Sequence, residues 1–388
     1  MRAKGGDPAA EKTYRLPPIS FAVSMLFPPG LLILFGALLA MLFMIGYYLT
    51  DTSAGLSNAP FVLYIGLAFG VYALVRAFLA SFQFKPAPIL GVVVSPEGNL
   101  ASLIDLICGK LDTRRPDNIL IGPDCDLYVT RVRLKLPEGQ VLKGRTLYVG
   151  RPLLELVRKP EFNALMAHEF AHFSGGDIAY TVYALPVYRS CREGIRRLWS
   201  YITAPARGWF IIATLPFRIL FVVPLVCLFA YFSVFVLIDS RMSRARESRA
   251  DAIASDLFGA ESTRLALAHV VYLSELWSWM YDRMLRGQMD RGNYFKMLRE
   301  VAEANSSRSG QMLSAAVRKE ERHSFRSHPM LAQRLRGLDF SRARFTVPSA
   351  DETYRGGDLT WLDQVLCRYV NMDLDNFRHL LELHKVRA

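Results

Sequence analysis

The sequence predicts a mainly α-helical integral membrane protein in which transmembrane helices carry an α+β domain with a short β-sheet. Two uncharged or nearly uncharged runs, from Pro29 to Leu49 and from Pro60 to Phe82, are the first observation. Each is long enough to cross a hydrocarbon core about 30 Å thick as a helix. The second observation is composition, because 52% of the 388 residues are hydrophobic although 21% are charged. That combination is unusual for a soluble protein.

Basic residues set the expected orientation in the membrane. Four of them precede the first run, whereas the connection from Thr50 to Ala59 has neither Lys nor Arg. Because basic residues favour the cytoplasmic side, the N-terminus is predicted to lie there, and two spans return the chain to the same side. The five cysteines are widely spaced without a CxxC pair, which indicates free thiols in a reducing compartment.

Short β-rich runs after the second membrane run predict the α+β domain. Leu100 to Leu111 has helical periodicity, and LKLPEGQVLKG resembles a hairpin. Three runs are expected as strands: 118–121, 127–136 and 146–149. The last of these, TLYV, could pair with an extended substrate backbone, or could be an ordinary core strand.

A third hydrophobic region, from Trp209 to Asp239, is long for one membrane crossing and short for two. Both flanks are rich in arginine, so both ends favour the cytoplasmic side. We therefore expect an even number of crossings or a re-entrant hairpin that turns near Pro216 to Pro224. Alternatively, a single crossing would need part of Ile178 to Tyr201 as its other leg. Arg218 would line a polar cavity or sit at the hairpin's tip.

These features divide the chain into six segments. The expected order is a cytoplasmic N-terminal arm (1–28), two transmembrane helices (29–83), a first part of the α+β domain (84–208), a membrane hairpin or re-entrant segment (209–239), a second part of the α+β domain (240–340) and a C-terminal extension (341–388).

The motif HEFAH, residues 168–172, predicts a metal site and a zincin-like character for the α+β domain. His168 and His172 lie one helical turn apart, so both imidazoles can bind one metal ion. Glu169 is offset around the helix and can reach a water on the metal without binding the metal itself. Pro160 and Glu161 suit the first turn of this helix.

A catalytic zinc site needs a third protein ligand. The later segment RESRADAIASDLFG offers Glu247 for this position and places Asp251 one turn further on the same helical face. Asp251 can accept a hydrogen bond from the free ring nitrogen of a ligand histidine and so fix its orientation. The two motifs together predict a site with two histidines and one glutamate.

In chain order, HEFAHFSGGD, ESRADAIASDLFG and SHPMLAQRLRGL resemble the forty-eighth metallopeptidase family, which includes the HtpX heat-shock protease and the type I CAAX prenyl protease. The resemblance covers roughly residues 146–338 and is nearer to the HtpX branch. DLYVTRV stands where that family has an NAF-like strand. The resemblance implies zinc binding by His168, His172 and Glu247, catalysis by Glu169, support from Asp177 and Asp251, and an approach of His328 and Arg334 to the active site.

The expected function is therefore that of a membrane-bound zinc endopeptidase with one Zn²⁺ per chain. Water activated by zinc would attack the peptide bond with Glu169 as general base. His328 or Arg334 could stabilise the oxyanion, or could instead be a buried structural histidine and an exposed arginine. Quality control or processing of membrane proteins, at a bacterial inner membrane with the catalytic domain facing the cytoplasm, is the setting that the resemblance and the basic flanks suggest.

Polypeptides, membrane proteins in particular, and the lipid bilayer are the expected partners. The net charge of +12 raises nucleic-acid binding as a possibility, but arginines at the ends of membrane segments fit anionic lipid headgroups better, so no nucleic acid is expected. Two other functions stay open: a membrane scaffold or sensor with a structural zinc, and a zinc amidase that acts on a non-protein substrate.

Overall fold

The computed structural model describes residues 33, 36, 40, 72, 86–95, 98–174, 177–205, 210–289, 292–321, 334–335, 345–354 and 360–386. The N-terminal arm and nearly all of the two expected membrane spans lie outside these residues. The chain divides into two compact units, and each is described by itself. The first unit comprises Met1–Phe84 and Gly176–Ala245, and the second comprises Lys85–Gly175 and Arg246–Ala388.

A four-stranded sheet organises the second unit. Its strand order is β2 (Val92–Val94), β3 (Asn118–Gly122), β7 (Thr146–Gly150), β4 (Leu127–Thr130). The central strands β3 and β7 are parallel, whereas β2 and β4 pair antiparallel at the two edges. A smaller sheet joins β1 (Ala87–Pro88), β5 (Leu134–Lys135) and β6 (Val141–Leu142). The antiparallel β5–β6 pair is the hairpin expected at LKLPEGQVLKG.

The two central strands are apolar on both faces, as strands covered on both sides usually are. On β3, Ile119 and Ile121 belong to the large core of the unit, whereas Leu120 between them packs in a smaller cluster with Tyr148 and the β5–β6 hairpin. This alternation follows from the twofold period of a strand. The helices α5 (Gly98–Lys110) and α7 (Lys159–Ser174) contribute to the large core.

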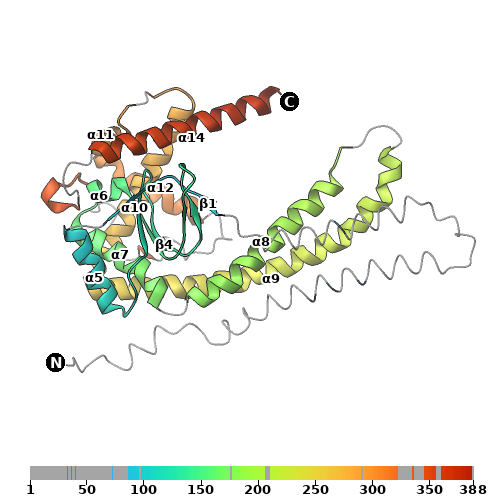
Figure 1. The fold of residues 1–388 in the computed structure, drawn as a ribbon, viewed down its shortest axis with the longest axis horizontal. Coiled ribbons are helices and arrows are strands. Elements are labelled where there is room, and N and C mark those ends of the chain that lie inside the picture. The colour runs from blue at the N-terminus through green and yellow to red at the C-terminus, as the bar shows by residue number, and fades with distance from the viewer. Residues whose placement is uncertain are drawn as a thin grey trace, which may run out of the picture. The chain divides into compact units, whose positions relative to one another are not determined.

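The other helices of the second unit follow the sheet in the chain and complete the large core (Figure 1). They are α6 (Arg151–Leu156), the end of α9 (Phe210–Phe258), α10 (Ala260–Leu285), α11 (Tyr294–Ala304), α12 (Ser309–Glu321) and α14 (Thr360–Val386), with short 3₁₀ turns at Ser306–Arg308 and Ala350–Glu352. The described part of the chain is thus mainly helical with small sheets, as the sequence predicted.

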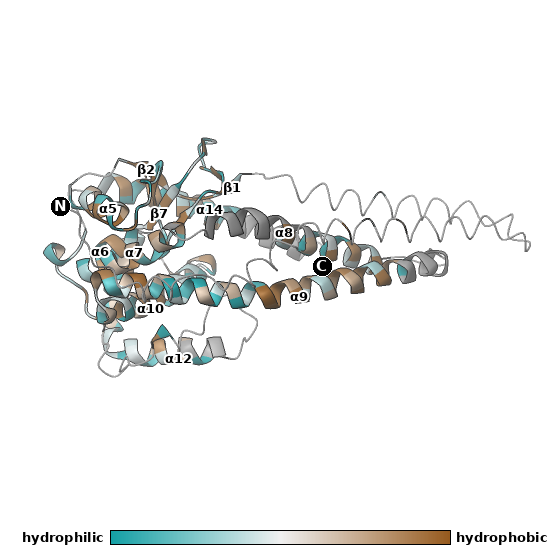
Figure 2. Cartoon of the chain, turned by 90° about the horizontal axis from the view of Figure 1, so that it is seen from below, coloured by the Kyte–Doolittle hydropathy of each residue, from teal (hydrophilic) through white to brown (hydrophobic). Residues whose placement is uncertain are grey.

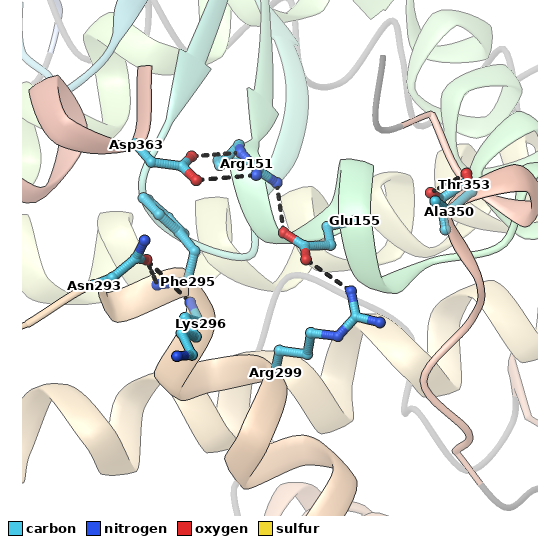
Figure 3. A network of polar contacts seen from close by, with 9 residues as sticks. All are labelled: Arg151, Glu155, Asn293, Phe295, Lys296, Arg299, Ala350, Thr353 and Asp363. Atoms are coloured by element: carbon cyan, nitrogen blue, oxygen red, sulfur yellow. Dashed lines mark hydrogen bonds and ion pairs between the residues drawn. The ribbon is translucent and has the colours of Figure 1, made fainter. Parts of the chain in front are cut away.

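A buried polar network ties α14 to the sheet end of the core (Figure 3). Arg151, only 1% exposed, donates through Nε to Asp363 Oδ1 at 2.7 Å and through Nη2 to Asp363 Oδ2 at 3.2 Å. Its Nη1 lies 3.0 Å from Glu155, which also accepts from Arg299 of α11 at 2.9 Å. Two-pronged arginine pairs of this kind fix geometry as well as charge.

The described parts of the expected C-terminal extension, 341–388, contribute to the core of the second unit. Phe345, Leu362 and Leu366 are almost fully buried and belong to the same core as α7 and the sheet. The reason is the apolar stripe of α14, which recurs at helical spacing and packs on α10. Residues 345–354 and 360–386 are therefore part of the second unit.

In the first unit, α8 (Asp177–Ile202) and α9 run side by side in opposite directions (Figure 1). Tyr188 packs on Phe232 with ring centroids 5.4 Å apart, and Tyr201 packs on Phe221 at 6.0 Å. The predicted turn near Pro216 to Pro224 is wrong, because α9 continues through both prolines as one helix. The alternative leg, 178–201, is the one that pairs with it.

Arg218 lies near the connection between α8 and α9. Its Nη2 donates to the carbonyl oxygen of Ala204 at 2.6 Å. Ala204 lies two residues beyond the last residue of α8, so this hydrogen bond joins Arg218 of α9 to the connection that follows α8. Arg218 therefore lies at the tip of a helical hairpin, as one alternative expected. The hairpin is formed by α8 and α9, not by two halves of the 209–239 region.

The stretch of α9 from Phe221 onward is long and apolar enough to cross a membrane, with a mean hydropathy of 2.7 in its most apolar window and only 22% of that window buried. Figure 2 shows hydrophobic colouring along much of α9. Among the described residues, it is the helix that meets these criteria. The apolar side chains that remain exposed on it are Val222, Val223, Val226, Phe229, Val234 and Leu237.

Candidate metal centre

Helix α7 carries His168, Glu169 and His172. It begins at Lys159, so Pro160 occupies the first turn, as expected. Phe162, Met166 and Phe170 are buried in the core and hold one face of the helix. The two histidines share another face, with ring centroids 5.0 Å apart and the rings nearly perpendicular.

The end of α9 brings Glu247 to these histidines. Glu247 Oε2 lies 3.4 Å from His168 Nε2, and Oε1 lies 3.7 Å from His172 Nε2. One ligand atom from each of the three residues can be chosen so that all lie within 4.8 Å of one another. Two atoms bound tetrahedrally to zinc at about 2.0–2.1 Å would be about 3.3 Å apart, so the donor set and its spacing fit a zinc ion.

Asp251 and Arg334 surround the ligand His168. Asp251 Oδ1 lies 3.0 Å from His168 Nδ1, so this carboxylate faces the ring nitrogen opposite Glu247. Arg334 donates through Nε and Nη2 to the two oxygens of Asp251, each at 2.8 Å, and its Nη1 lies 3.2 Å from Glu247. Three guanidinium nitrogens thus face the two carboxylates of α9.

This arrangement shifts the pKa values of His168 and Asp251. Burial lowers the pKa of His168, but its hydrogen bonds with Asp251 and Glu247 outweigh burial and raise the pKa to about 9. Burial favours a higher pKa for Asp251, but hydrogen bonds with His168 and Arg334 lower it below its usual range. The carboxylate of Asp251 is therefore ionised and suited to orient His168.

Glu169 is half-buried beside the ligand histidines. Burial raises the pKa of its carboxyl group, while His168 and His172 partly offset the rise. It lines a cavity of about 400 Å³ together with His168, His172, Glu247, Asp251 and Arg334. Ala164 and Leu165 of α7 with Ala266, Leu267 and Val270 of α10 form its apolar wall. A carboxyl group with a raised pKa in a cavity is a candidate for proton transfer.

Strand β4 borders the same cavity through Asp126, Leu127 and Tyr128. The prediction that TLYV could receive a substrate strand is wrong, because β7 already pairs with β3 on one side and β4 on the other. β7 is the ordinary core strand that was its alternative. In the described part of the chain the edge strands of this sheet are β2 and β4. β4, which borders the cavity, lies in DLYVTRV, the segment noted as a departure from the family pattern.

The sequence did not point to Arg249. Its buried side chain donates through Nη2 to the carbonyl oxygen of Ala171, the residue before ligand His172, at 3.2 Å. Only its place between Glu247 and Asp251 could have drawn attention to it. The other two expected residues are not placed: Asp177 starts α8 but its side chain is not described, and His328 lies outside the described residues.

Two histidines, a glutamate and a further carboxylate around one cavity define the metal-dependent hydrolases that carry HEXXH. Residues 138–341 match the model of Peptidase family M48. The chain belongs to this family and is a metallopeptidase.

Similar proteins include Protease HtpX from Haemophilus influenzae. The PittEE and KW20 strain proteins are each 25% identical over 243 residues, which cover 61% of this chain and 83% of the relative. The crystal structure of S. mikatae Ste24p is 18% identical and covers 84% of this chain and 67% of that one, with a TM-score of 0.31.

Proposed function

We propose that this metallopeptidase is a membrane-bound zinc endopeptidase that cleaves polypeptides, membrane proteins among them, in quality control or processing. The observation that carries the proposal is the meeting of His168, His172 and Glu247 beside Glu169. A zinc ion held by these three residues would supply a Lewis acid that makes water nucleophilic at neutral pH.

The residues of the chain account for the remaining chemistry. Glu169 takes the proton from the attacking water and returns it to the leaving amine. Its partial burial, which raises its pKa, helps the second transfer, because a carboxyl group with a very low pKa holds a proton poorly. Asp251 holds His168 through Nδ1 and so leaves Nε2 directed at the metal position.

The free edge of β4 suits an extended polypeptide substrate. Among the described residues, β4 pairs with β7 only, so the other side of its backbone is available for hydrogen bonds. An added strand there would lie along the cavity that Glu169 lines. Main-chain pairing accepts many sequences, which suits an enzyme that degrades or processes varied chains.

The membrane setting is supported by α9. Its exposed apolar side chains from Val222 to Leu237 would be costly in water and are suited to lipid. Arg241, Arg244 and Arg246 follow this stretch. Basic residues at the end of a span favour the cytoplasmic side, and we therefore place the metal site on the cytoplasmic face.

Proteomic comparison tests the proposal in cells. Membranes that contain the wild type are compared with membranes that contain Glu169→Gln at the same level. We expect intact polypeptides, membrane proteins among them, to accumulate with the variant, because the site keeps its ligands but loses its base. Identical sets of intact proteins and fragments would contradict an endopeptidase function. The non-protein amidase alternative would leave protein fragments unchanged but alter a small-molecule amide.

A further inference from the structure

The α8 helix carries a charged cluster halfway along its contact with α9. Glu193 accepts from Arg196 Nε at 2.9 Å and from Arg197 Nε at 2.6 Å, and the exposed Arg192 lies one residue before it. The side chain of Arg196 is 70% exposed. Three arginines and one glutamate leave a net positive charge on this part of α8.

Side-chain contacts between the two helices fix the depth of the cluster. A Cβ at Gly194 would lie 2.7 Å from Leu228 Cδ2, so Gly194 comes directly against Leu228. Since the helices are antiparallel, Arg196 is level with Val226. Val226 is 59% exposed and lies well inside the largely apolar stretch of α9 from Phe210 to Ile238. The charged cluster is thus level with the middle of that apolar stretch.

The apolar and the charged side chains of α8 lie on different faces of the helix. Val187, Cys191 and Leu198 are buried against α9 at helical spacing. Arg192 and Arg196 fall on a face that α9 does not cover. The helix therefore has one apolar face for its partner and one charged face for something else.

Chain connectivity requires α8 to cross the membrane if α9 does. Glu247, near the end of α9, lies 3.4 Å from His168 of α7. Helix α7 ends at Ser174 and α8 begins at Asp177. The start of α8 and the end of α9 are therefore on the same side, and the chain can only leave and return across the bilayer as a pair.

We propose that the α8–α9 pair crosses the bilayer with the charged face of α8 against water, within the thickness of the membrane. Charged side chains at that depth are costly in lipid and are found facing a protein interior or a water-filled cavity. The cluster's net charge and the exposure of Arg196 and Arg192 favour water over a dry protein contact. The polar face would keep a hydrated path open beside the lipid-facing side of α9.

This inference rests on the membrane crossing of α9 in the proposed function and is independent of peptidase activity. Single cysteines are placed at Arg196 and at Val226, its counterpart at the same depth, in the full-length protein with its native cysteines replaced. A second matched pair is Arg192→Cys and Ala230→Cys. Each variant, in membranes, is treated with a permanently charged, water-soluble thiol reagent, which lipid excludes. A wild-type-like elution profile in size-exclusion chromatography confirms that each variant folds.

We expect Arg196→Cys and Arg192→Cys to react at least about tenfold faster than Val226→Cys and Ala230→Cys, because a charged reagent reaches only thiols in contact with water. Equal, fast reaction at all four positions would place the pair outside the bilayer and overturn both the crossing and the inference. Slow reaction at all four would leave the crossing intact and overturn the hydrated face. Loss of activity in Glu169→Gln is measured in a separate experiment. Failure of the enzymatic proposal can therefore be distinguished from failure of the hydrated-face proposal.

Discussion

Asp251 Oδ1 lies 3.0 Å from His168 Nδ1, one helical turn beyond Glu247, whose carboxylate lies 3.4 Å from the other nitrogen of the same ring. One segment of α9 therefore places two carboxylates at the two nitrogens of one imidazole, and Glu247 belongs with His168 and His172 to the cluster that could hold a metal ion. We expect the metal affinity of this cluster to depend on Asp251 as well, although Asp251 lies outside the cluster.

We predict that Asp251→Asn weakens zinc binding about 10- to 100-fold, because an amide orients His168 less strongly than a carboxylate. The zinc dissociation constant, measured by competition with a chelator, checks this. Asp256→Asn, an exposed acid on the same helix, is the matched control and should bind zinc as the wild type does. Equal zinc affinities for the two variants would show that Asp251 does not contribute to zinc binding.

Glu247→Ala should lose most of its zinc, because two histidines alone rarely hold a catalytic ion. The zinc content of the purified protein, by elemental analysis, is expected to fall from about one per chain to a small fraction of that value. A zinc content unchanged in this variant would mean that the third ligand lies elsewhere in the chain.

Arg334 could stabilise the oxyanion or could position the carboxylates of Asp251 and Glu247, and these two roles predict different effects of substitution. The sequence suggested an oxyanion stabiliser, whereas its guanidinium is hydrogen-bonded to Asp251 and lies 3.2 Å from Glu247. We therefore predict that Arg334→Met lowers zinc affinity together with kcat, and that Arg334→Lys restores only part of both because lysine cannot make the two-pronged contact. A lower kcat with unchanged zinc affinity would instead support the oxyanion role.

Asp124 is not part of the candidate metal site, and its ionisation predicts how the stability of the fold depends on pH. Burial, followed by the charge of Asp126, raises its pKa from 3.8 to about 6, while it accepts a hydrogen bond from Tyr148 at 2.8 Å. Because the folded-state pKa is raised, its stabilising contribution is full below about pH 4 and is lost as the pH rises through 6.

Asp124→Asn should therefore raise Tm at pH 8, by an amount equivalent to about 1–2 kcal/mol, and leave it nearly unchanged at pH 4. The asparagine oxygen can still accept from Tyr148, so the substitution changes mainly the charge. Thermal unfolding at the two pH values checks the difference. An equal shift at both would show that the charge of Asp124 does not matter.

That His168, His172 and Glu247 come together could be predicted from sequence because the geometry within each helix is local. His168 and His172 share a face of one helix through the helical repeat, and Glu247 and Asp251 do so on another. Which strand lies at the edge of the sheet could not be predicted, since TLYV and LYVT have the same composition. Only the long-range pairing of β3 with β7 decides that LYVT is the one left at the edge.

The sequence left two courses open for the third hydrophobic region, a turn near its prolines or a single helix paired with part of Ile178 to Tyr201. Pro216 and Pro224 are ordinarily signals of a helix end or kink, which favoured the turn. The structure has one helix, α9, paired with α8, whose arginines had argued against that alternative. The contact of Gly194 with Leu228 that pairs the two helices has no signature in sequence.

The central claim is that Glu169 is a base and not a ligand, and the most direct test measures both properties on one protein. Purified wild type and Glu169→Gln are compared for bound zinc and for turnover of an unfolded polypeptide. We expect equal zinc and a turnover that falls about 10²- to 10⁴-fold, the usual contribution of a general base. Turnover within tenfold of the wild type at equal zinc would contradict the assigned role.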